Sequence, residues 1–157
     1  MVLLTRPTSR ILALDLYEGY FGISDNKPNR LFANAEKAGV SGRIEARVGD
    51  VRAMPLEDNS FEAAVSAYVI DHLSREGVEQ SLSEIRRVLR PNGEFLLMVI
   101  NPDIWIQIAY PFFVRHGDFF SETDHQRWQS ALIQAGFEII EQGTSPGTLY
   151  LLASKPG

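Results

Sequence analysis

The sequence has no cysteine, only three histidines and no excess of basic residues. Without cysteine there can be no disulfide, and a metal site would need His or carboxylate ligands. His72, His116 and His125 show no HExxH-like spacing, so we expect no metal site. Fifteen basic against twenty acidic residues give a net charge of −5, which argues against binding to a phosphate backbone. No nucleic-acid partner is therefore expected.

Long hydrophobic runs are also missing. The longest apolar runs, such as residues 95–100, are far shorter than the roughly 20 residues of a membrane-spanning helix. The short apolar start at 1–4 has neither a basic region before it nor a cleavage-site pattern, so it is not typical of a signal peptide. We therefore expect a cytoplasmic protein without a membrane partner. A chain of 157 residues with 45% hydrophobic content fits a single globular domain over 1–157.

Apolar patterns along the chain alternate between strand and helix. Strands are expected at 10–16, 43–48, 61–66 and 94–100, with helices at 28–38, 74–89 and 121–136. Two further segments, 137–142 and 148–153, are separated by a Gly- and Pro-containing loop and indicate a closing antiparallel pair. This order predicts an α/β fold with a mostly parallel, twisted sheet and an antiparallel C-terminal strand.

Potential ligand-binding residues follow the first three strands. Asp15 ends the first strand, Gly49-Asp50-Val51 follows the second, and Ala67-Tyr68 follows the third. In doubly wound sheets ligands bind at the carboxyl ends of the strands. A carboxylate can accept hydrogen bonds from both ribose hydroxyls or from an exocyclic amine. Taken alone, an Asp at a strand end is more often a turn or helix-cap residue, and Gly-Asp after a strand is equally often just a turn.

Their combination resembles a known family. The segments are NAEKAGV at 34–40, GDVRAMPLEDNSF at 49–61, SAYVIDHL at 66–73 and EIRRVLRPNGEF at 84–95. They are similar to the motifs of class I S-adenosylmethionine-dependent methyltransferases, in particular the small-molecule branch related to ubiquinone and menaquinone biosynthesis. The likeness runs from about residue 11 to residue 100. It implies a Rossmann-like sheet of order 3-2-1-4-5-7-6, with strand 7 antiparallel.

The resemblance also implies roles for particular residues. Asp15 matches the acidic residue that holds the ribose hydroxyls, and Gly49-Asp50 with the Val51 backbone matches the adenine site. Ala67 and Tyr68 match the positions that line the methionine portion and the substrate mouth. His72 is a candidate general base, because an imidazole can accept a proton near neutral pH; a structural role at the strand end is the alternative.

The aromatic segment 101–121 is expected to help roof the pocket. An apolar or aromatic small-molecule substrate is the matching expectation. Aromatic core packing or a dimer surface is the alternative for this segment.

One departure from the family pattern concerns its first motif. Members begin with a strand that ends in a Gly-x-Gly-x-Gly loop, whereas residues 1–10 contain no glycine and do not resemble the family. We therefore expect the first strand, its loop and its helix to be missing, and cofactor binding to be weakened or lost. A competing alignment places 11–23 over the first motif, with Gly19 as the one remaining loop glycine.

A missing central strand would open two sheet edges, which are templates for pairing. A homo-oligomer that repairs the sheet is therefore expected, unless the N-terminal segment pairs antiparallel there or the flanking strands close up. The leading hypothesis is an S-adenosylmethionine-dependent methyltransferase-like protein acting on a small molecule. The alternative is a noncatalytic binding or oligomerisation module, or a truncated remnant of such an enzyme.

Overall fold

The computed structural model describes residues 9–18, 27–101 and 124–157. Internal contacts divide the chain into two compact units, Met1–Met54 and Pro55–Gly157, and each is described by itself. The expectation of a single domain over 1–157 stays a prediction. In the described part of the chain no helix is long and apolar enough to cross a membrane.

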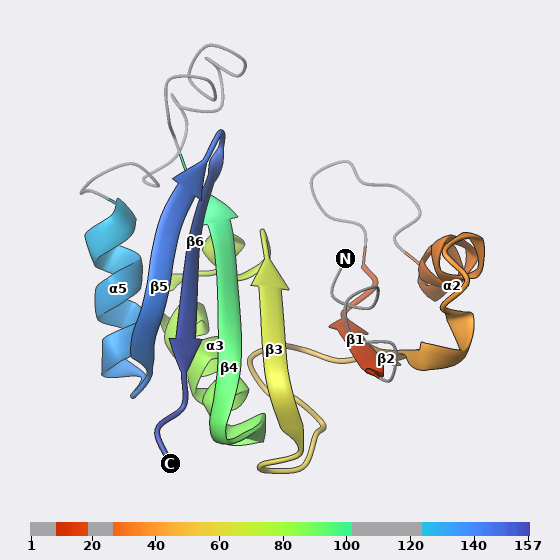
Figure 1. Cartoon of the computed structure of the whole chain (residues 1–157), viewed down its shortest axis with the longest axis horizontal. Coiled ribbons are helices and arrows are strands. Elements are labelled where there is room, and N and C mark those ends of the chain that lie inside the picture. Colours follow the sequence, from red (N-terminus) through yellow and green to blue (C-terminus); the bar gives the residue numbers. More distant parts are fainter. Residues whose placement is uncertain (1–8, 19–26, 102–123) are drawn as a thin grey trace. The chain divides into compact units, whose positions relative to one another are not determined.

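The first unit contains one parallel strand pair and its crossover helix. Strand β1 (Ile11–Asp15) pairs with β2 (Ile44–Val48), in register from Ile11 opposite Ile44 to Asp15 opposite Val48. Helix α2 (Pro28–Lys37) and the 3-10 turn η1 (Ser41–Arg43) connect the two strands (Figure 1). A proline, Pro28, occupies the first helical turn, where its missing N–H costs nothing. Gly39, with φ of +69°, follows the helix and reverses the chain.

The second unit is a four-stranded mixed sheet with two helices. Its strands are β3 (Phe61–Ala67), β4 (Leu89–Ile100), β5 (Glu138–Ser145) and β6 (Thr148–Ser154), in the order β3-β4-β6-β5. β3 and β4 are parallel, and β6 runs antiparallel to both β4 and β5. Helix α3 (Arg75–Val88) precedes β4, and α5 (Asp124–Gln134) precedes β5. The 3-10 turn η2 (Ile70–His72) lies between β3 and α3.

These two sheet orders agree with the expected fold class. β2-β1 corresponds to strands 3-2 of the order implied by the resemblance, and β3-β4-β6-β5 corresponds to strands 4-5-7-6. The antiparallel strand is in the expected place, between the strands that correspond to 5 and 6. The prediction of an α/β sheet with an antiparallel C-terminal strand is confirmed.

The core of the second unit lies between the helices and one face of its sheet. Alternate residues of β4 and β6 point into it and are fully buried, which is the period-2 pattern of a one-sided strand. Phe95 packs against Phe137 with ring centroids 5.6 Å apart. The apolar residues on one side of α3 and the first residue of β4 are all buried: Val78, Leu82, Ile85, Val88 and Leu89. Ser74 caps helix α3, since its Oγ accepts a hydrogen bond from Gly77 N at 3.2 Å.

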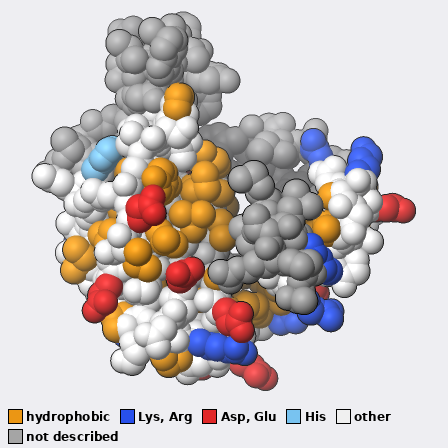
Figure 2. All heavy atoms as spheres, in the orientation of Figure 1, with side chains coloured by type: hydrophobic (Ala, Val, Ile, Leu, Met, Phe, Trp, Pro, Cys, Tyr) orange, Lys and Arg blue, Asp and Glu red, His pale blue; other side chains and the backbone are white. Residues whose placement is uncertain are grey.

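The opposite face of this sheet also carries apolar side chains. Val65, Leu96 and Leu152 form one row across β3, β4 and β6, and Ala67, Met98 and Tyr150 form the next. Val65 is 59% exposed, and Leu96 and Leu152 are half-buried. Figure 2 shows hydrophobic side chains gathered over these strands. Apolar surface of this kind marks a binding or association face.

Two local predictions differ from the structure. The predicted helix ended at 89 and the next strand was expected to begin at 94, but β4 already begins at Leu89 and includes residues 90–93. The strand accommodates Pro91 and the positive φ of Asn92 (+62°) through an irregularity opposite β3, and Asn92 N donates to Lys155 O. The closing strands are also longer than expected, so Pro146-Gly147 alone connects them; Gly147 has φ of +73°.

Candidate functional site

The carboxyl edge of the first unit's sheet brings three predicted residues together. Asp15 is the last residue of β1, and Gly49-Asp50 follows the neighbouring strand β2. Gly49 N donates a hydrogen bond of 3.0 Å to Asp15 O, which extends the ladder by one residue. Because parallel strands end at the same edge, the two carboxylates belong to one surface. Val51 continues from Asp50 into a tight turn closed by Ala53 N and Asp50 O at 3.1 Å.

Asp15 has its carboxylate oriented by the backbone that follows. Its Oδ1 accepts a hydrogen bond of 2.7 Å from the backbone N of Tyr17. Tyr17 itself has a positive φ of +53°. Burial, and then the nearby Asp15 charge, raise the pKa of Tyr17 above its usual range. A carboxylate offers about four acceptor positions and is the kind of group that can accept hydrogen bonds from ribose hydroxyls.

Asp50 is engaged by Arg52. Arg52 Nε lies 3.0 Å from both carboxylate oxygens, its Nη2 lies 2.6 Å from Oδ2, and its backbone N donates to Oδ1 at 2.9 Å. These hydrogen bonds, with the Arg52 charge, hold the pKa of Asp50 below its ordinary value. The carboxylate is therefore ionised but already satisfied. An exocyclic amine would have to displace the guanidinium before it could donate to this group.

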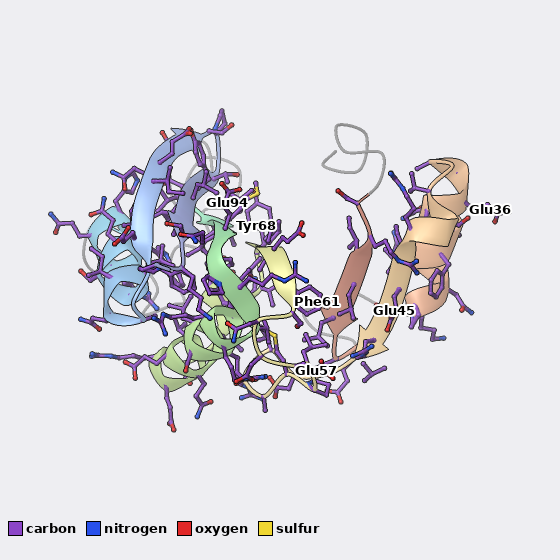
Figure 3. All side chains as sticks on the ribbon, turned by 60° about the horizontal axis from the view of Figure 1, so that its bottom comes forward. Glu36, Glu45, Glu57, Phe61, Tyr68 and Glu94 are labelled. Atoms are coloured by element: carbon purple, nitrogen blue, oxygen red, sulfur yellow. The ribbon has the colours of Figure 1, made fainter. Side chains whose placement is uncertain are left out.

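In the second unit, Ala67 and Tyr68 occupy the carboxyl end of β3. Tyr68 N donates to Met98 O at 2.9 Å, and its φ of +55° is uncommon for a bulky residue. The phenol lies 2.5 Å from Thr148 Oγ1 at the start of β6. One hydrogen bond thus holds the backbone of Tyr68 and the other holds its side chain; the residue is 42% exposed and is labelled in Figure 3. Strained backbone that is held in this way occurs most often at functional sites.

Asp71 and His72 follow Tyr68 in η2. Asp71 is 8% exposed, and its Oδ2 accepts a 3.2 Å hydrogen bond from Ile100 N at the end of β4. Among the described residues, its buried Oδ1 has no hydrogen-bond partner. His72, the predicted general base, is exposed at the end of the same turn. Asp71 thus ties η2 to β4, whereas His72 is the member of the pair that a ligand could reach.

Sequence reasoning did not identify three of these contacts. Arg52 stands two residues after Asp50, a spacing that could have suggested the ion pair. Thr148 is 80 residues from Tyr68, and only the antiparallel register of β4 and β6 brings them together. Asp71 carried no signal that distinguished it from its neighbour. The aromatic segment expected to roof the pocket lies outside the described residues, apart from Asn101.

In the described ranges, no group of three or more His, Cys, Asp or Glu side chains could hold a metal ion.

The predicted site residues form two groups, one in each unit. Asp15, Gly49, Asp50 and Val51 belong to the first unit, and Ala67, Tyr68 and His72 belong to the second. The first group offers carboxylates, and the second offers an aromatic hydroxyl and an imidazole.

Comparison with known proteins gives this arrangement a context. The chain is 27% identical over 151 residues to the biotin biosynthesis bifunctional protein BioHC of Teredinibacter turnerae, covering 94% of this chain and 25% of that protein. It is 32% identical over 92 residues to the ubiquinone/menaquinone biosynthesis C-methyltransferase UbiE of Methylobacterium nodulans, covering 59% of this chain and 32% of that protein. The chain thus spans between a quarter and a third of these curated relatives.

The fold is also similar to those of solved methyltransferase structures. The structure of an O-methyltransferase-like protein from Nostoc punctiforme superimposes with a TM-score of 0.75 at 19% identity, over 98% of this chain and 46% of that chain. The model of the methyltransferase domain matches residues 4–97, which is more than half of the sequence. The chain therefore belongs to the methyltransferase-domain family of class I S-adenosylmethionine-dependent methyltransferases.

Proposed function

We propose that the chain binds S-adenosylmethionine and takes part in methyl transfer to a small molecule. The observation that carries this proposal is the pair of carboxylates, Asp15 and Asp50, at the carboxyl edge of two adjacent parallel strands. Asp15 would accept the ribose hydroxyls. Asp50 would accept the adenine amine once Arg52 has moved aside, with Gly49 and the Val51 backbone beside the base.

A separate part of the proposal concerns two residues of the second unit. Ala67 presents little bulk and Tyr68 a fixed phenol at the end of β3, which suits the methionine portion and the substrate mouth. The cofactor supplies an electrophilic methyl group when bound. Transfer to an acceptor atom needs mainly proximity and in-line alignment. Where the acceptor must lose a proton, the exposed imidazole of His72 is the proposed base.

Small-molecule methylation is the class that the names of the relatives favour. They refer to biosynthesis of biotin and of ubiquinone and menaquinone. An apolar or aromatic acceptor is proposed on the composition of 101–121, and a cytoplasmic location on the sequence as a whole.

Calorimetric titration of the chain with S-adenosylmethionine and with its demethylated product tests the proposal. Saturable binding of either compound is expected, and Asp15→Ala should abolish it because the ribose hydroxyls lose their acceptor. Glu36→Ala is a matched control, since it removes an exposed carboxylate from α2 of the same unit (Figure 3). No heat at millimolar ligand would refute the enzyme proposal, and unchanged affinity in Asp15→Ala would refute the ribose assignment.

A noncatalytic module is the second candidate. The full engagement of Asp50 by Arg52 favours it, because the adenine position then needs rearrangement before a ligand can enter. The same titration distinguishes the two candidates. If neither compound binds while the chain still self-associates, the oligomerisation module is the better description.

We also propose that two copies of the chain associate through the apolar face of the four-stranded sheet. β3 is an outer strand of this sheet, and Val65 on it is 59% exposed. Light scattering should show a concentration-dependent dimer that Val65→Lys disrupts, because a charge would be buried in the contact. Ile133→Lys, at an α5 position that is 60% exposed, is the control. A monomer at all concentrations would contradict the proposal.

A further inference from the structure

A groove lies between α3 and α5 of the second unit, away from the strand ends described above. It has a volume of about 1070 Å³ and is lined by side chains from both helices. Arg75, Glu79, Arg86 and Arg87 contribute from α3, and Arg127 and Gln134 contribute from α5. Its lining combines exposed residues such as Arg75 and Gln134 with Trp128, which is buried.

The charge of the groove is opposite to that of the chain. Four arginines and one carboxylate line it, whereas the whole sequence carries a net charge of −5. Such a local reversal of sign creates a surface that attracts anions. Arginine also offers a planar fork that matches a carboxylate with two parallel hydrogen bonds.

Two of the four arginines are already paired. Arg87 binds Glu84 and Asp58, and Arg75 binds Glu79 across one helical turn. Their charges are therefore largely neutralised within the protein.

The other two arginines, Arg86 and Arg127, make contacts of a different kind. Arg86 donates through Nε to Gly136 O at 3.3 Å, and the guanidinium of Arg127 lies 5.1 Å from the centre of the Trp128 ring. Within the described ranges, neither is joined to a carboxylate. These two cations come from opposite walls of the groove, Arg86 from α3 and Arg127 from α5.

We propose that this groove binds an acidic peptide segment of a partner protein, with Arg86 and Arg127 each donating to a carboxylate of that segment. The lining also includes the half-buried Ala131, which can contact the methylene groups of Asp and Glu side chains. A peptide fits better than a nucleic acid, because two available arginines on a net-acidic protein are too few to neutralise a phosphate backbone. The proposal does not depend on methyl transfer.

Fluorescence anisotropy with a labelled Asp/Glu-rich peptide and the full chain tests it, with the same peptide in Asn/Gln form as the ligand control. The acidic peptide should bind and the amide peptide should not, and added salt should weaken the binding. Arg86→Gln and Arg127→Gln should each weaken it about tenfold through loss of a charge-assisted hydrogen bond. Arg90→Gln is the matched control, because Arg90 pairs with Glu62 and does not line the groove.

A further variant avoids any loss of native contacts. Gln134→Glu adds a carboxylate to the exposed groove wall and should weaken binding to a similar extent. Equal binding of the two peptides, or an equal effect of Arg90→Gln, would overturn the proposal. Tighter binding of a short single-stranded oligonucleotide than of the acidic peptide would overturn it in favour of a phosphate polymer.

Discussion

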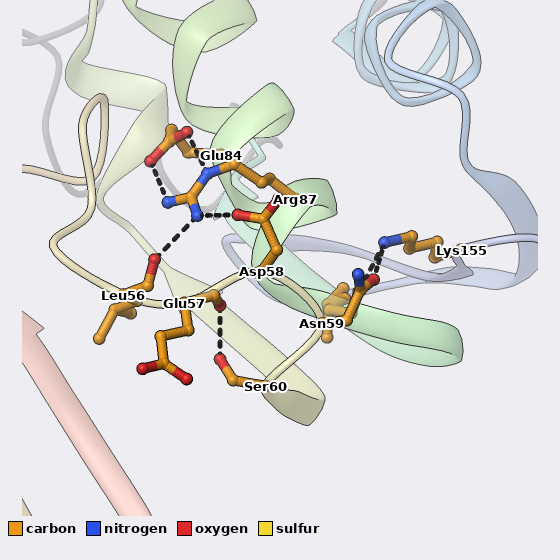
Figure 4. A network of polar contacts seen from close by, with 9 residues as sticks. Leu56, Glu57, Asp58, Asn59, Ser60, Glu84, Arg87 and Lys155 are labelled. Carbon is orange, nitrogen blue, oxygen red and sulfur yellow. Dashed lines mark hydrogen bonds and ion pairs between the residues drawn. The ribbon is translucent and has the colours of Figure 1, made fainter.

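Arg87 is expected to hold the segment that leads into β3, and its replacement tests how the second unit is stabilised. Its Nε and Nη2 form a fork with the Glu84 carboxylate at 2.7 and 2.8 Å, and its Nη1 donates to Leu56 O at 2.8 Å and to Asp58 at 2.5 Å. Figure 4 shows this network. In the backbone, Asn59 N donates a further hydrogen bond to Arg87 O at 3.0 Å.

The expected loss of stability depends on how exposed the paired side chains are. The Arg87 side chain is 30% exposed and Glu84 is 19% exposed, so their forked pair is worth roughly 1 kcal/mol, at the upper end for partly exposed pairs. Asp58 is 66% exposed and adds less, while the Leu56 carbonyl bond adds about 1 kcal/mol. Arg87→Ala should thus lower the free energy of unfolding by about 2 kcal/mol. For a chain of this length that lowers Tm by roughly 4–8 °C.

Thermal and urea unfolding measure this loss. Arg75→Ala is the matched control on the same helix, because Arg75 is 88% exposed and stands in the first turn, where a positive charge is unfavourable. Its Tm should stay within about 2 °C of the parent. Arg87→Lys should fall between the two, because it keeps the charge and loses the fork. If Arg87→Ala loses no more than the control, Arg87 does not anchor the 56–60 segment.

Three further predictions concern single contacts. Asp71→Ala should lower the free energy of unfolding by about 1–2 kcal/mol in urea titration, because Ile100 N loses its acceptor, whereas Asp71→Asn keeps an acceptor and should lose less. Gly136→Ala should cost about 1–2 kcal/mol by the same assay, because φ is +84° and the new methyl would lie 2.9 Å from Arg86 Nε. The third variant, Arg52→Gln, removes the partner of Asp50. Because the pKa of Asp50 is lowered in the folded protein, the ion pair stabilises the fold above about pH 3.9, and this stabilisation is lost as the pH falls further. Arg52→Gln should therefore lower the free energy of unfolding at pH 7 but not in acid, and a difference independent of pH would contradict the pairing.

Much of the fold could be predicted because strand and helix periods are local properties of the sequence. The alternation of buried residues along β4 and β6 and the 3.6-residue period of α3 match the predicted segments. The prediction failed at 90–93, where Pro91, Asn92 and Gly93 are typical turn residues. There, pairing with β3 and with Lys155 overrides the local preference, and neither partner can be identified from those four residues.

The candidate site, too, could be predicted from the sequence only in part. Asp15 and Asp50 could be placed from sequence, because parallel strands connected by a helix must end at one edge. Whether each carboxylate can accept a ligand depends on contacts that strand order does not specify. Tyr17 N uses one acceptor position of Asp15, while the side chain and backbone of Arg52 occupy both oxygens of Asp50. A ligand that donates to Asp50 therefore requires an ion pair to break. It follows that Arg52→Gln should strengthen binding of any ligand that donates to Asp50, and an unchanged affinity for S-adenosylmethionine in that variant would remove Asp50 from the proposed site.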